Sequence, residues 1–138
     1  MTHTAVHTRG EVPRHRIHCA YSVVGNRLFV LGGGLADNEN DYHPLNTIDI
    51  LNLGMNFFLF AHSPSETFIW ETQATRGDAP LPCRGLNVCA YGKRLLKYGG
   101  VGAQGSLGMV SVLNSETLVW EAEIDLQVLT LLLLFCFY

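Results

Sequence analysis

The sequence predicts an all-β protein in which one four-stranded unit occurs twice. Residues 8–33 recur without a gap as residues 75–100, and the shared positions are mostly glycine, proline and arginine. Short segments of alternating polarity lie between glycine-containing turns, a pattern typical of successive antiparallel strands. Glycine accounts for 14 of the 138 residues, which disfavours helices, and no helical pattern is evident before residue 125.

The repeat continues beyond residue 100 with a changed spacing. Residues 66–71 match residues 116–121, and residues 50–52 match residues 112–114. The first copy is therefore longer between its third and fourth strands, and we assign the surplus to a 12-residue insertion at 54–65. Without this insertion the period is within the range of propeller blades.

In the first copy, strands are expected at 17–24 and 28–31, on either side of the turn Gly25-Asn26. The glycine can take a positive φ and so close a tight hairpin. Residues 47–53 alternate as a third strand, and residues 68–72 form a fourth strand that contains Trp70.

The second copy predicts the same order of strands. They lie at 86–91, 94–98, 109–113 and 118–122, and the last of them contains Trp120. Gly92-Lys93 is the turn between the first two. We expect two four-stranded antiparallel sheets, packed face to face through the region around Trp70.

These residues resemble the Kelch repeat, the four-stranded blade of one class of β-propeller, over about residues 8–123. The marks of that repeat are a double glycine after the second strand and a tryptophan in the fourth, here Gly32, Gly33, Trp70, Gly99, Gly100 and Trp120. An arginine before the first strand is also usual, and the candidates are Arg14, Arg16 and Arg84. The aromatic residue usual near the third strand is replaced by Ile48, Ile50, Val110 and Val112.

The resemblance implies a propeller fragment of two blades. Glycines at a crowded junction between blades permit a backbone approach that a Cβ would block, and each tryptophan supplies a large apolar body between neighbours. A propeller normally closes with about 4 to 8 blades, so we expect an incomplete ring that begins inside a blade. We assign residues 1–124 to the Kelch-type blades and residues 125–138 to an apolar C-terminal tail.

Two segments depart from the repeat, at 55–60 and 129–138, and both are rich in phenylalanine and leucine. Translated non-coding sequence, such as a retained intron, would explain both. For the tail, a membrane anchor and a terminal strand or helix on an open blade edge are alternatives. A helix over 126–138 spans only about 20 Å of an apolar layer of about 30 Å and lacks flanking basic residues, which argues against an anchor.

Composition and charge limit the partners and the cellular compartment that we expect for the chain. The formal net charge is −3 and the nine lysines and arginines are scattered, so a nucleic-acid partner is not expected. The four cysteines have no Cys-x-x-Cys spacing and no signal peptide precedes them, which favours free thiols in the cytoplasm or nucleus.

No constellation of residues predicts catalysis, a metal or another cofactor. His15 and His18 lie on opposite sides of an expected strand, and His3 and His7 have no acidic or cysteine partner at a suitable spacing. The acidic run 37–41 lacks the glycine and distal glutamate of a calcium loop. The glycine clusters are not followed by Lys-Ser/Thr or by a helix, so they do not predict a phosphate loop.

The leading functional hypothesis is a non-enzymatic protein-interaction module, a scaffold or substrate-adaptor fragment. The longest loop between strands is 34–46, and we predict that it binds a protein partner with a basic segment through Asp37, Glu39, Asp41, Tyr42 and His43. A solvated acidic loop without a partner is the alternative for this segment. Self-association through open blade edges is also expected. The alternatives are a fragment of a Kelch-type small-molecule enzyme and a non-functional truncated product.

Overall fold

The computed structural model describes residues 8–38, 41–54 and 68–125, and it confirms the all-β class. Every regular element in these ranges is a strand. In chain order the strands are β1 (Thr8–Gly10), β2 (Ala20–Val24), β3 (Arg27–Leu31), β4 (Gly34–Asn38), β5 (Asp41–Pro44), β6 (Ile48–Asn52), β7 (Phe68–Gln73), β8 (Arg76–Gly77), β9 (Asn87–Tyr91), β10 (Arg94–Tyr98), β11 (Val101–Gly102), β12 (Gly105–Ser106), β13 (Met109–Asn114) and β14 (Val119–Asp125).

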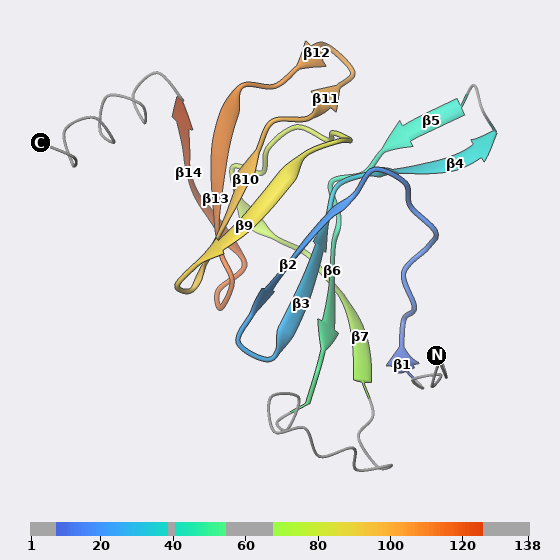
Figure 1. Cartoon of the computed structure of the whole chain (residues 1–138), viewed down its shortest axis with the longest axis vertical. Coiled ribbons are helices and arrows are strands. Elements are labelled where there is room, and N and C mark those ends of the chain that lie inside the picture. The colour runs from blue at the N-terminus through green and yellow to red at the C-terminus, as the bar shows by residue number, and fades with distance from the viewer. Residues whose placement is uncertain (1–7, 39–40, 55–67, 126–138) are drawn as a thin grey trace, which may run out of the picture.

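The strands form two five-stranded sheets and two small hairpins (Figure 1). The first sheet has the order β1-β7-β6-β3-β2, and the second has the equivalent order β8-β14-β13-β10-β9. β4 pairs with β5 and β11 pairs with β12. The eight strands expected from the sequence are all present, and the sequence turns at Gly25 and Gly92 have the predicted positive φ, 59° and 58°.

Each sheet contains a fifth strand that the sequence prediction of four antiparallel strands lacked. β1 runs parallel to β7, with Gly10 opposite Trp70, and β8 runs parallel to β14, with Gly77 opposite Trp120. Both glycines have positive φ, and a Cβ on either would collide with the carbonyl oxygen of its tryptophan. The sequence does not predict these two strands, because a segment of two or three residues carries no strand periodicity.

The first strand of each unit starts later than predicted. The expected strand 17–24 begins at Ala20, because His18 has a φ of 55° and interrupts the extended chain. Ile17 instead makes an isolated bridge to Gly34. In the second unit Arg84 makes the corresponding bridge to Val101.

The repeat recognised in the sequence also holds at the level of backbone hydrogen bonds. The amide of Leu53 donates to Asn26 O at 2.8 Å, and in the second unit Ser115 donates to Lys93 O at 2.9 Å. Leu45 N donates to Gly33 O at 2.8 Å, just as Leu107 N donates to Gly100 O at 2.9 Å. The two units are therefore two copies of one folded structure.

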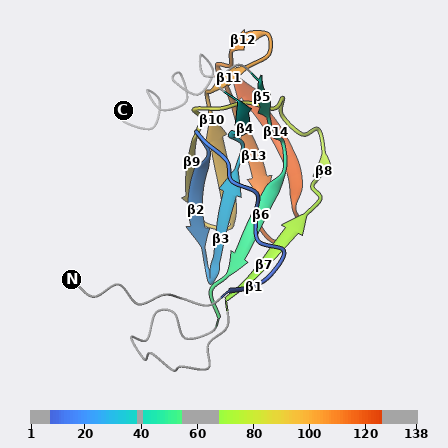
Figure 2. The same cartoon turned by 90° about the vertical axis from the view of Figure 1, so that its right-hand side faces the viewer.

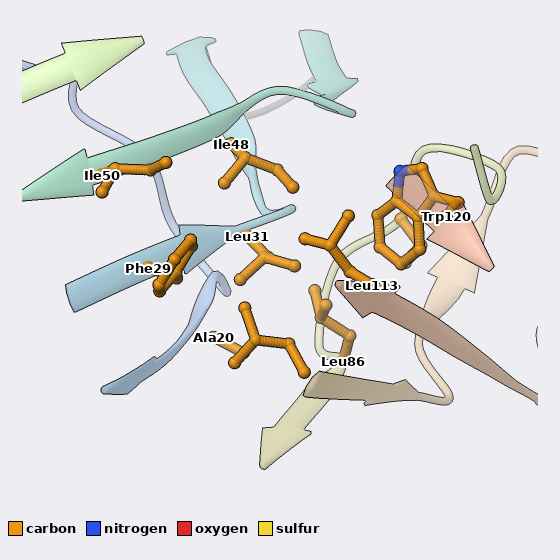
Figure 3. Close-up of a cluster of buried hydrophobic side chains, with 10 residues drawn as sticks. Ala20, Phe29, Leu31, Ile48, Ile50, Leu86, Leu113 and Trp120 are labelled. Carbon is orange, nitrogen blue, oxygen red and sulfur yellow. The ribbon is translucent and has the colours of Figure 1, made fainter. Parts of the chain in front are cut away.

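The core lies between the two sheets (Figures 2 and 3). Leu31 and Ile48 of the first sheet point toward Leu113 of the second, as Figure 3 shows, and Phe29 and Trp120 belong to the same buried cluster. Ala20, Ile50, Cys83, Leu86 and Leu95 complete the cluster. The prediction that the sheets pack through Trp70 is wrong, because alternation along β7 puts this half-buried side chain on the other face of the first sheet.

The two sheets pack against each other through different faces of the repeated unit. We call the face with Phe29 the front of the first sheet, and its counterpart in the second sheet carries Leu96. The opposite face is the back, with Leu28 in the first sheet and Leu95 in the second. Leu95 is fully buried in the core, so the front of the first sheet packs on the back of the second. The units are stacked head to tail.

The double glycine marks this junction. A Cβ on Gly32 would lie 2.5 Å from Leu86 Cδ2 and 2.9 Å from Cys83 O, both in the second unit. The next amide, Gly33 N, donates to Cys83 O at 3.0 Å. Gly99 is the counterpart of Gly32, but a Cβ there would have a single neighbour, Leu107 O, at 3.8 Å.

Substituting alanine at these two positions will separate backbone strain from the contact between the sheets. The φ values are similar, 60° at Gly32 and 68° at Gly99, so both variants carry the same strain. We expect Gly32→Ala to be the less stable by about 1–3 kcal/mol, because only its Cβ forces the sheets apart. Urea unfolding of the two variants measures the difference, and equal midpoints would contradict it.

The predicted insertion at 54–65 lies outside the described residues apart from Gly54, as does the tail from residue 126 onward. The strands that flank the insertion, β6 and β7, pair directly with each other. Among the described residues, no helix has the length and apolar character needed to cross a membrane.

Candidate protein-binding surface

The segment predicted as an acidic binding loop is a β-hairpin and not an irregular loop. β4 and β5 pair from Gly34↔Pro44 through Asn38↔Asp41 and form a sheet of their own. Pairing satisfies the backbone N–H and C=O groups that a long loop would leave to water. The bond from Leu45 N to Gly33 O closes the base of the hairpin.

Four of the five predicted binding residues lie on this hairpin. Asp41 is opposite Asn38, Tyr42 is opposite Ala36, and His43 is opposite Leu35. Asp37 is the extra residue where the register shifts between Ala36 and Asn38. Glu39 lies outside the described residues. The hairpin therefore brings Asp37 and Asp41 close together in the register.

The second unit has a shorter version of the same hairpin, β11–β12. Its register consists of two pairs, Val101↔Ser106 and Gly102↔Gly105. Both hairpins extend from the same end of the stacked sheets, which is the top of Figure 1. This end is thus where the two units differ most in the described structure.

A pocket of about 360 Å³ lies beside the base of the β4–β5 hairpin. The chain before β2 forms one wall, with Glu11, Val12, Pro13, Arg14 and Arg16. Leu35 and Leu45 come from the hairpin base, Thr47 immediately precedes β6, and Asp49 and Thr72 come from the first sheet. The pocket presents charges of both signs, so it does not select an anion or a cation.

A buried ion pair between Arg16 and Asp49 forms part of the pocket lining. The two side chains are only 7% and 4% exposed. Asp49 also accepts from Thr72 Oγ1 at 3.1 Å, and Arg16 Nη1 donates to Gly32 O at 3.1 Å. Arg16 Nε has no partner within the described structure. The network ties the leading segment of the first unit to its sheet and to the double glycine.

Of the three arginines considered in the sequence, Arg16 has a side chain that donates to the carbonyl oxygen of Gly32. Its counterpart in the second unit is Cys83, whose Sγ lies 3.8 Å from Gly99 O. Asp49 was not singled out, because a single aspartate on an alternating strand usually faces solvent. The corresponding residues of the second copy are the uncharged Ser111 and Cys83, so comparison of the two sequences does not indicate an ion pair.

A second charged pair lies on the front face of the second sheet. Arg94 Nε donates to Glu121 Oε2 at 2.6 Å, and Asn114 Nδ2 donates to Glu121 Oε1 at 2.9 Å. These bonds to the ionised carboxylate lower the pKa of Glu121, and the bond to Glu121 raises the pKa of Arg94. Both side chains are solvent-accessible, so the pair contributes little to stability.

Within the described ranges, the histidines and cysteines do not assemble into a site. His15 and His18 are exposed, and among the described residues no three histidine, cysteine or acidic side chains are grouped to hold a metal ion. Cys19, Cys83 and Cys89 are free thiols.

Comparison with known proteins does not assign the chain to a family. The chain matches no protein-family model, and no curated protein resembles it significantly.

Proposed function

We propose that the chain contributes two Kelch-type propeller blades and acts as a protein-interaction module. The support is the head-to-tail stacking of two repeated sheets, with glycines at their junction and Trp120 in the core. A blade of this kind needs neighbours on both faces, which fits the half-buried apolar residues on the back of the first sheet.

The length of the β4–β5 hairpin is the observation that carries the binding role. The strands β4 and β5 contain 5 and 4 residues, whereas β11 and β12 contain 2 each. The hairpin belongs to neither large sheet, so its sequence can vary without disturbing the core. Asp37 lies on β4, and Asp41 and Tyr42 lie on β5. Two carboxylates and an aromatic residue on one hairpin suit a basic peptide segment.

A direct test is the binding of labelled 12-residue peptides, one rich in lysine and arginine and one rich in glutamate, followed by fluorescence anisotropy. We expect the basic peptide to bind more tightly and its affinity to fall as salt rises. Replacing Asp37 and Asp41 together by asparagine should weaken its binding about 2- to 10-fold, because two rim charges are lost.

Asp78→Asn is the matched control, since Asp78 is exposed and lies in the leading segment of the second unit, outside the β4–β5 hairpin. It should leave the affinity unchanged. The proposal fails if the acidic peptide binds equally well, or if Asp78→Asn weakens binding as much as the hairpin variant does.

A further inference from the structure

The second unit has a pocket of its own, about 120 Å³ in volume, which is the counterpart of the larger pocket in the first unit. Both pockets are lined by a proline of the leading segment, by the leucine that follows the small hairpin and by a residue of the third long strand. These are Pro13, Leu45 and Asp49 in the first unit and Pro80, Leu107 and Ser111 in the second. The repeat therefore places the same pocket in both units, with different side chains inside it.

The charges inside the two pockets differ. In the first unit Arg16 and Asp49 form the buried ion pair, and Val30 is opposite Asp49 in the register. In the second unit the uncharged Ser111 takes the place of Asp49, and Lys97 is opposite it in the place of Val30. Each unit thus has a buried cation at this pocket, but the carboxylate of Asp49 has no counterpart in the second unit.

The cation of the second pocket has few partners. Lys97 is only 6% exposed, although lysine is seldom buried unless it is paired. Its Nζ donates to Leu81 O at 3.4 Å, which is long for a hydrogen bond, and an ammonium group has three N–H donors. Within the described structure Lys97 takes part in no ion pair. Because a buried charge without a counter-ion is costly, this position favours an anion from solution.

The 120 Å³ pocket has room for such an anion, whereas the neighbouring cavity does not. Leu81 and Lys97 also line a cavity of about 10 Å³ beside Trp120, which holds at most about one water molecule. The larger pocket approaches the volume of about 150 Å³ that accommodates benzene in an engineered protein cavity. It therefore has room for a ligand of about four to six non-hydrogen atoms.

The walls of the pocket determine which kind of anion fits. Apart from Lys97 and Ser111, the pocket is lined by Gly99 and by the apolar residues Pro80, Leu81, Leu107 and Met109. An inorganic anion would lose its hydration against these apolar walls, whereas the hydrocarbon tail of a carboxylate gains by the same contact. Leu81 and Met109 are 55% and 39% exposed, so the pocket reaches the surface and a ligand can enter it.

We propose that this pocket binds a short-chain carboxylate, whose charged group pairs with Nζ of Lys97 while its hydrocarbon tail packs on Leu107 and Met109. The ligand takes the part that Asp49 plays in the first unit, as the counter-ion of a buried cation. The site belongs to the second unit and the β4–β5 hairpin to the first, so this proposal does not depend on what the hairpin binds.

Isothermal titration calorimetry of the full-length chain with sodium propionate tests the site. Propionamide has nearly the same shape without the charge, and we expect it to bind about 10- to 100-fold more weakly, because the bond to a charged group is lost. Sodium phosphate should also bind more weakly than propionate. Propionate that does not bind, an amide that binds equally well, or phosphate that binds as tightly would each overturn the proposal.

Lys97→Met removes the charge and keeps an unbranched side chain, so it should weaken propionate binding about 10- to 100-fold. Lys93→Met is the matched control, because it removes the same charge from a side chain that is 72% exposed. It should leave the affinity unchanged. A Lys97→Met variant that retains the affinity, or a Lys93→Met variant that loses as much, would contradict the assignment to Lys97.

Two further variants separate the ligand from an internal counter-ion. Ser111→Asp places a carboxylate where Asp49 lies in the first unit, so it should exclude propionate, and it replaces Lys97→Met if circular dichroism shows that variant unfolded. Glu123 is opposite Ser111 in the register, which makes it the acidic residue to exclude. Glu123→Gln should leave the affinity within about 3-fold. An increase of about 10-fold or more would identify Glu123 as the counter-ion of Lys97 and overturn the proposal.

Discussion

Replacing Trp120 by alanine is expected to lower the free energy of unfolding by about 3–5 kcal/mol, the range for a large aromatic side chain lost from a core. Trp120 is 6% exposed and packs in the cluster that joins the two sheets. Its Nε1 also donates to Thr75 Oγ1 at 3.1 Å, which fixes the chain between the units. The substitution removes contacts to both sheets at once, and the cavity that it leaves adds to the loss.

Trp70→Ala is the matched comparison, because Trp70 occupies the same place in the first repeat. Its side chain is half-buried on the back face, so we expect a loss of less than about half as much. Urea unfolding, followed by circular dichroism at concentrations where the chain is monomeric, measures both. Equal losses would mean that Trp70 and Trp120 are equally buried in solution and would contradict the head-to-tail stacking.

Thr75→Val isolates the hydrogen bond from the packing of the indole. It removes the acceptor for Trp120 Nε1 with little change in side-chain volume, and we expect a loss of about 1 kcal/mol. A loss as large as that of Trp120→Ala would show that the hydrogen bond, and not the packing of the ring, holds the two units together.

The antiparallel strands could be predicted because their signals are local. Alternating apolar residues and the turns at Gly25 and Gly92 fix the two strands beside each turn, and the structure confirms them. The repeat then supplied the order of the remaining strands in both units. Strand ends were less predictable, since His18 leaves the extended conformation without any signal in residue type.

The features that could not be predicted depend on contacts between distant residues. The parallel strands β1 and β8 are short, and only their positions beside Trp70 and Trp120 make them strands. Likewise, Trp70 and Trp120 follow similar sequences, yet Trp70 is half-buried on the back of the first sheet and Trp120 lies in the core. The burial of the two side chains differs because the first unit packs on the back of the second. A motif within one unit cannot indicate this order.

The candidate binding residues were located by loop length, and that reasoning identified the right segment but the wrong conformation. A 34–46 segment rich in acidic residues lacks strong strand propensity, and the hairpin forms because its base is fixed by Leu45 N and Gly33 O. The pocket at that base was not predicted, since its walls come from three separate parts of the chain.

Breaking the buried ion pair is expected to be about as damaging as removing Trp120. Arg16→Cys leaves the buried Asp49 with Thr72 as its remaining side-chain partner, so an ionised carboxylate stays buried without its cation. We expect a loss of about 3–5 kcal/mol, because the desolvation of the remaining charge is no longer offset. Asp49→Ser should have a similar effect, since it leaves the guanidinium of Arg16 buried in the same way.

The second unit provides the control, because Cys83 and Ser111 occupy the positions of Arg16 and Asp49 in a sheet of the same register. The double variant Arg16→Cys/Asp49→Ser copies that arrangement and removes both charges together. We therefore expect it to be more stable than either single variant, with a coupling energy of about 1–3 kcal/mol in a double-mutant cycle of urea unfolding. Losses that simply add would show that Arg16 and Asp49 act independently, Arg16 through Gly32 and Asp49 through Thr72, and that their ion pair does not stabilise the first unit.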